Sequence, residues 1–69
     1  MAVFVTYDKE IKDIVKYIAQ GEDIVVTDNK GKYLGLLQND RAIRYLHRPE
    51  TKIDKIMVKL KPLKNYDII

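Results

Sequence analysis

Two kinds of apolar pattern alternate along the first third of the chain. Residues 2–6, AVFVT, are mostly β-branched or aromatic, and a run this short predicts a buried strand. In residues 7–21, YDKEIKDIVKYIAQG, apolar side chains recur at the 3.6-residue period of a helix. We expect Asp8 to cap this helix and Gly21 to end it in the left-handed conformation. Its apolar face is predicted to comprise Ile11, Ile14, Val15, Ile18 and Ala19.

Residues 22–37, EDIVVTDNKGKYLGLL, predict a β-hairpin. Strands at 24–27 and 33–37 flank the turn 28–31, in which Asn29 and Gly31 tolerate positive φ. Gly35 is unusual because glycine weakens a strand. Inside a strand it usually marks a bulge or a close approach by another backbone or a ligand.

A polar segment, Gln38-Asn39-Asp40-Arg41, leads from this hairpin into a second, shorter helical pattern. Asn39 or Asp40 is expected to cap the helix, and Asp40 otherwise to pair with Arg44 four residues later. Pro49 is expected to end the helix. Its apolar side is predicted to carry Ala42, Ile43 and Leu46.

The C-terminal part of the chain changes character. Ile53, Ile56 and Met57 are spaced for one or two helical turns. Residues 58–64, VKLKPLK, alternate apolar residues with Lys, and Pro62 restricts such a strand to a sheet edge. The predicted order is β-α-β-β-α with a C-terminal linker or edge strand, which is an α/β (α+β) fold.

Length and composition set the scale of this fold. With 69 residues, 46% hydrophobic and 33% charged, the chain predicts one globular domain. A chain of this size buries only about 60% of its unfolded surface, so a partner would add stability. The absence of Cys excludes disulfides and Cys-type zinc sites. No apolar run approaches a membrane span, and the start lacks signal-peptide features, so we expect a cytoplasmic protein with no membrane partner.

Charge is distributed unevenly along the chain, and this raises the question of nucleic-acid binding. The net charge is +3, with −2 in residues 1–40 and +5 in residues 41–69. Basic residues near Tyr33, Tyr45 and Tyr66 are one way to bind nucleic acid. The lysines alternate with apolar residues, however, as they do along solvated edges. Nucleic-acid binding is therefore kept as an alternative.

Catalytic and metal-binding patterns are not found in the sequence. There is no Ser-His-Asp set and no Gly-rich phosphate-binding motif, so we do not expect an enzyme. His47 is the single histidine and has no second His or Cys with which to hold a metal. A position at a helix C-terminus, favoured by the helix dipole, accounts for it.

The run DIVVTDNKGKYLGLLQNDRAIRYL resembles the body of a cystathionine-beta-synthase (CBS) motif. The matching positions are the Asp that ends an apolar strand, the Gly-containing turn, the strand with Gly at its centre and the short helix after it. Upstream, VFVTYDKEIKDIVKYIAQ resembles the lead strand and first helix of the motif, and TKIDKIMVKLKPL downstream resembles its linker. On this resemblance, residues 1–48 form one CBS-type motif. Residues 49–69 form a linker and the start of a second motif, or a dimerisation tail. The residues that carry the match are Asp28, Asn29, Gly31, Leu34, Gly35, Leu36, Leu37, Ala42 and Ile43.

The resemblance implies a regulatory or sensory module. CBS motifs act in pairs, packed sheet to sheet, and bind adenosine derivatives such as AMP, ADP, ATP or S-adenosylmethionine in the clefts between them. A single motif is expected to pair as a homodimer or with a parent enzyme or transporter that it regulates. No covalently bound cofactor is implied. A dimerising interaction domain without a ligand is the alternative.

The resemblance also implies a set of ligand-binding residues. The family's hydroxyl residue and ribose-binding Asp fall on Gln38 and Arg41, and neither matches. Arg41 cannot accept a hydrogen bond from ribose, but it can donate two to a phosphate. The adenine is expected to lie against Ile24 and Val26. The predicted set is Thr6, Ile24, Val25, Val26, Gln38 and Arg41.

Overall fold

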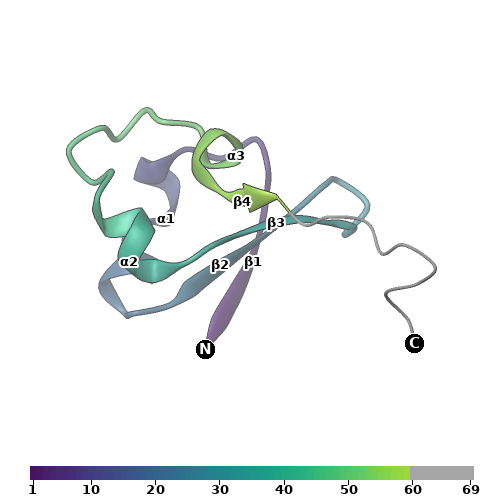
Figure 1. The fold of residues 1–69 in the computed structure, drawn as a ribbon, viewed down its shortest axis with the longest axis horizontal. Coiled ribbons are helices and arrows are strands. Elements are labelled where there is room, and N and C mark those ends of the chain that lie inside the picture. The colour runs from purple at the N-terminus through teal and green to yellow at the C-terminus, as the bar shows by residue number, and fades with distance from the viewer. Residues whose placement is uncertain (60–69) are drawn as a thin grey trace.

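The computed structural model describes residues 1–59 of the 69. Four strands form one sheet in the order β1-β2-β3-β4, and the three helices lie on one side of it (Figure 1). The predicted α+β class and the β-α-β-β-α order are confirmed. Residues 60–64 of the expected edge strand, and Tyr66, lie outside the described residues. The elements are β1 (Ala2–Thr6), α1 (Ile11–Ala19), β2 (Asp23–Thr27), β3 (Tyr33–Leu37), α2 (Asn39–Ile43), α3 (Ile53–Ile56) and β4 (Val58–Lys59).

Strand pairing follows from the connections. β1 and β2 are parallel and are joined through α1, whereas β2 and β3 form the predicted antiparallel hairpin. β4 pairs antiparallel with β3 over two residues and is an edge of the sheet, as the alternation of Val58 and Lys59 predicts.

The hydrophobic core lies between the helices and one face of the sheet. Ile11, Ile14 and Ile18 of α1 pack over the inward-facing residues of β2 and β3, and Ile53 of α3 is fully buried beside them. Because α3 contributes to this core, the predicted boundary at residue 48 does not divide it. The other core residues are Ile24, Val26, Leu37, Ala42 and Ile56.

The apolar face of α1 is narrower than predicted. Ile11, Ile14 and Ile18 are buried, but Val15 is 43% exposed and Ala19 is also exposed. The nine-residue helix packs on the sheet through its i, i+3, i+7 row. Within residues 1–59, no other element covers the side of the helix that carries Val15 and Ala19.

The prediction that Asp8 caps α1 is wrong. The N-cap is Glu10, whose backbone N–H donates to Asp13 Oδ2 at 2.9 Å, one half of a capping box. Asp8 lies before the helix and accepts a hydrogen bond from Thr6 Oγ1 at 2.7 Å. The helix begins late because its first turn is tied to the segment before α3. There Ile11 N donates to Thr51 O. Gly21 has φ 79°, which confirms the left-handed end.

Both features that a glycine inside a strand predicts, a bulge and a close approach by another backbone, are found at or next to Gly35. Val26 pairs with Gly35 and Thr27 with Tyr33, so Leu34 is the extra residue of a bulge. A Cβ on Gly35 would lie 2.6 Å from Val58 O and 2.7 Å from Met57 Sδ. Only glycine therefore lets β4 lie this close to β3.

The turn before β3 matches its prediction in part. Gly31 has φ 84°, whereas Asn29 does not adopt a positive φ. Asp28 Oδ1 instead holds the turn by accepting hydrogen bonds from the backbone N–H groups of Lys30 and Lys32.

α2 begins in a different way from the one predicted. Its N-cap is Gln38, and the Asn39 side chain reaches back to donate to Ile18 O at 2.8 Å and Glu22 O at 3.1 Å. The Asn39 backbone N–H donates to Asp23 Oδ1 at 2.7 Å, so a carboxylate from β2 serves the start of this helix.

The rest of α2 also departs from the prediction. Ala42 is buried, but Ile43 and Leu46 are 49% and 42% exposed, because a single short turn presents only one residue to the core. The helix ends at Ile43, well before Pro49. In the described part of the chain Asp40 forms no ion pair with Arg44.

We expect Gly35→Ala to destabilise the fold by about 1–3 kcal/mol, because the new methyl group overlaps backbone that cannot move away easily. Gly31→Asn is the control. Nothing lies within 4 Å of its added Cβ, and Asn tolerates positive φ. Urea denaturation followed by circular dichroism measures both variants. An unchanged midpoint for Gly35→Ala would contradict the close packing of β4.

Candidate functional site

The sheet face opposite the helices carries a continuous apolar row. The strand register aligns Phe4 of β1 with Val25 of β2, Val25 with Leu36 of β3, and Leu36 with Val58 of β4. These residues alternate with the core residues, so they point away from the helices. We call Phe4, Val25, Tyr33, Leu36 and Val58 the open face.

Three of the five open-face residues are strongly exposed, and none of the five is charged. Phe4 is 62% exposed, Val58 57% and Tyr33 55%. The Phe4 and Tyr33 rings lie 5.9 Å apart between centroids, in contact across β2. Contiguous apolar surface of this kind marks an interaction site in soluble proteins.

Two of the predicted ligand residues do not lie in a cleft. Ile24 and Val26 are 0% exposed and point into the core under α1, so their side chains cannot contact an adenine as hypothesised. The reason is the strand alternation, which turns Val25 alone of the three toward the open face. Contact with a base would therefore be through the backbone of Ile24 and Val26, and their place in the ligand-binding set stays a prediction.

The structure also separates Thr6 from the polar segment. Thr6 pairs with Thr27 at one end of the parallel strands, whereas Gln38 follows Leu37, which pairs with Ile24 near the other end. The three-residue difference along β2 corresponds to about 10 Å. The Thr6 hydroxyl is already engaged with Asp8. Thr6 and Gln38 therefore do not form one pocket.

Gln38 and Arg41 remain close in sequence and are both exposed at the start of α2. Arg41 Nε donates to Ile56 O at 2.6 Å, which links α2 to the end of α3. The first helix amide, that of Asn39, is taken by Asp23. Arg41 thus has a structural hydrogen bond, and its terminal guanidinium nitrogens are the groups left for an anion.

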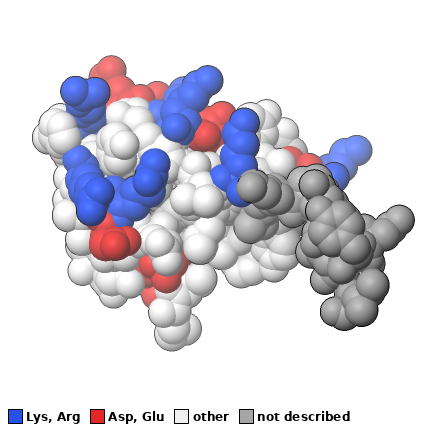
Figure 2. All heavy atoms as spheres, in the orientation of Figure 1, with Lys and Arg blue, Asp and Glu red and all other residues white. Residues whose placement is uncertain are grey.

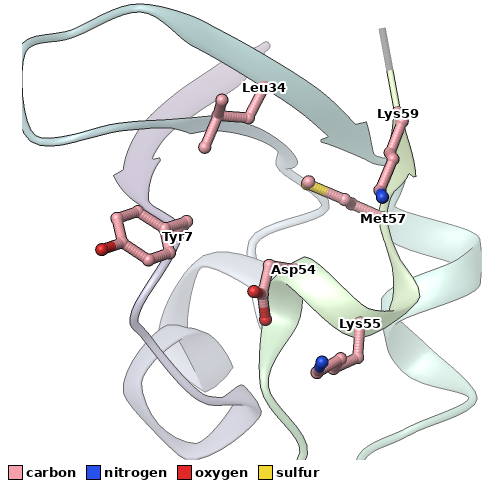
Figure 3. A pocket seen from close by; sticks show the side chains of 6 residues that line it. All are labelled: Tyr7, Leu34, Asp54, Lys55, Met57 and Lys59. Atoms are coloured by element: carbon pink, nitrogen blue, oxygen red, sulfur yellow. The ribbon is translucent and has the colours of Figure 1, made fainter.

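A pocket that the sequence did not indicate lies at the hairpin end of the sheet, beneath α3. Its volume is about 520 Å³, and its lining combines apolar walls with one carboxylate and two lysines (Figure 3). Asp54 Oδ1 is buried and has no hydrogen-bond partner within the described residues. We call this the Asp54 pocket. The residues that line it are Tyr7, Leu34, Asp54, Lys55, Met57 and Lys59.

No sequence signal pointed to the Asp54 pocket. Tyr7 follows a strand and Asp54 lies in a one-turn helix, 47 positions apart in the chain. Only the docking of α3 and the bulge at Leu34 bring them to the same hollow.

The charged side chains of the described residues do not form a single basic stripe on the face that Figure 2 shows. On the face shown in Figure 2, Lys and Arg side chains occur in separate groups with Asp and Glu between them. Within residues 1–59, no group of three or more His, Asp or Glu side chains is placed to hold a metal ion, and His47 is exposed. No helix of this region has the length and apolar character that membrane crossing requires.

Comparison of the chain with protein-family models, with curated proteins and with solved structures finds no match. The CBS resemblance therefore stays a prediction that rests on the residues quoted for it.

Arg41→Ala is expected to lower the free energy of unfolding by about 1–3 kcal/mol, because Ile56 O would lose its donor in a partly buried position. Arg44→Ala is the matched control, since Arg44 is exposed and its side chain is not among the hydrogen bonds or ion pairs of the described residues. Urea denaturation measures both. Equal midpoints would show that Arg41 does not hold α3.

The Thr6 hydroxyl donates to Asp8 and thereby lowers the pKa of that carboxyl from its ordinary value of 3.8. Because the folded pKa is the lower one, the hydrogen bond stabilises the fold above pH 3.8. That contribution is lost as the pH falls through the folded pKa. In Thr6→Val we expect the Asp8 pKa to rise toward 3.8, as measured by NMR titration of the carboxyl carbon. A pKa that stays low would assign the shift to another cause.

Proposed function

We propose that this chain acts as a paired regulatory module in which two copies pack through their open faces. The observation that carries the proposal is the apolar row from Phe4 to Val58 across all four strands. An apolar sheet face gains stability when another surface covers it, and within residues 1–59 the helices cover only the opposite face.

A second copy is the partner that fits the open face best. The five open-face residues are uncharged, so two copies can bring them together without burying an unpaired ion of this row. The Phe4 and Tyr33 rings supply the large aromatic area on which interface energy concentrates. A twofold pair places the same row against itself, and this is the commonest symmetry among oligomers.

The ligand part of the proposal is an adenosine nucleotide, as the CBS resemblance implies. Gln38 and Arg41 support it as neighbouring exposed polar groups at one end of each sheet. The exposed guanidinium can donate to a phosphate while Nε stays bonded to Ile56 O.

A dimerising domain without a ligand is the second candidate. It is favoured by the placement of Ile24 and Val26 in the core and of Thr6 away from Arg41. Both candidates share the paired assembly, and they differ only in whether a nucleotide is retained.

We expect Phe4→Glu to convert the dimer to a monomer, because pairing would bury two unpaired carboxylates. Val15→Glu is the matched control. It places the same charge at an exposed apolar position of α1, on the opposite layer of the fold.

Native mass spectrometry and light scattering of both variants measure the assembly. A wild-type chain that stays monomeric at millimolar concentration would overturn the pairing. So would a Phe4→Glu variant that dimerises as tightly as Val15→Glu.

A further inference from the structure

The Asp54 pocket contains an acceptor without a donor. Asp54 Oδ1 is buried, and within the described residues it accepts no hydrogen bond. A buried carboxylate oxygen in this state is costly to the fold, since it has lost water and gained nothing in return. A ligand with a hydrogen-bond donor at this point would satisfy it.

The walls of the pocket restrict the chemistry of that ligand. Leu34, Met57 and the Tyr7 ring offer apolar and aromatic surface, and Figure 3 shows them around the same hollow as the Asp54 carboxylate. A flat, largely apolar body is the shape that such walls accept. The volume of about 520 Å³ lies within the range of small-molecule sites.

Two lysines add a preference for negative charge. Lys55 and Lys59 line the same pocket from α3 and β4, and both are exposed. The ion pairs of the described residues involve neither of them. The ligand therefore carries a hydroxyl or amino donor for Asp54, a flat body for the apolar walls and an anionic group for the lysines.

We propose that the Asp54 pocket binds a nucleoside monophosphate, with Asp54 accepting from ribose hydroxyls, the base against Tyr7 and Met57, and the phosphate at Lys55 and Lys59. The choice of an adenosine nucleotide as the probe rests on the proposed function. The location is different, because neither Gln38 nor Arg41 lines this pocket and it is formed within one copy of the chain.

The test is a titration of the full chain with AMP, followed by ¹H–¹⁵N NMR, for the wild type and three variants. Asp54→Ala is expected to weaken AMP binding at least tenfold. Glu50→Ala, the matched loss of an exposed carboxylate outside the pocket, is expected to leave it within twofold. Gln38→Ala, an exposed position of the polar segment that does not line the pocket, is likewise expected to leave binding at the pocket within twofold, as followed by the Tyr7 and Met57 amide signals.

The melting temperature of Asp54→Ala distinguishes a ligand-binding role of Asp54 from a structural one. Because Asp54 Oδ1 has no partner, Asp54→Ala is expected to keep or raise the melting temperature while it weakens binding. Tyr7→Leu gives a second test at a partly exposed position, with an expected loss of at least threefold in AMP affinity.

The outcomes separate this inference from the proposed function. AMP binding that Gln38→Ala abolishes and Asp54→Ala leaves unchanged would overturn the pocket and keep the nucleotide at the polar segment. A dimer that binds no AMP would overturn the pocket and leave the pairing intact. A monomer whose AMP binding depends on Asp54 and Tyr7 would support the pocket and overturn the pairing.

Discussion

The constraint on which this structure depends is that three short helices can cover only one face of a four-stranded sheet. Every fully buried aliphatic residue of β2 and β3 lies on the covered face, where Ile24, Val26 and Leu37 meet α1. The alternation of the strands then sends Val25 and Leu36 to the other side, with Phe4 and Val58 in the same row. Because successive strand residues point to opposite faces, placing one set in the core leaves the other set on the open face.

The segment after α2 completes the covered layer by a few specific contacts. Ile53 fills the core, Arg41 Nε binds Ile56 O, and Gly35 lets Met57 and Val58 lie against β3. Because α3 is a single turn, these contacts set its position more than its own hydrogen bonds do. The same docking closes one side of the Asp54 pocket, so the contacts that position this segment also form the pocket.

The surfaces proposed for assembly and for ligand binding therefore lie on different sides of the molecule. The open face is uncharged and suits a second copy, whereas the Asp54 pocket lies on the helix side and combines a carboxylate with two lysines. A ligand there contacts α3 and β4, and β4 also contributes Val58 to the open face. The short strand β4 thus contributes one residue to each, Val58 to the open face and Lys59 to the pocket.

The sequence by itself determined the local elements of this protein. The strand at 2–6, the helical period of α1 and the hairpin with its left-handed Gly31 all follow from interactions between near neighbours. Glycine at position 35 indicated a close approach, and the tertiary structure supplied the partners, Met57 and Val58. Tertiary structure decided the rest. It left Val15 and Ile43 exposed, because a narrow strip of each helix meets the sheet.

Tertiary structure also decided which polar groups are used and which are left over. Asp23, distant in sequence, accepts a hydrogen bond from the first amide of α2, and Glu10 rather than Asp8 is the N-cap of α1.

Long-range packing also sets which polar residues meet. Thr6 and Gln38 lie near opposite ends of the sheet, while Tyr7 and Asp54 line the same pocket. The physical reason is that periodicity specifies which residues share a face, whereas long-range packing specifies which faces meet.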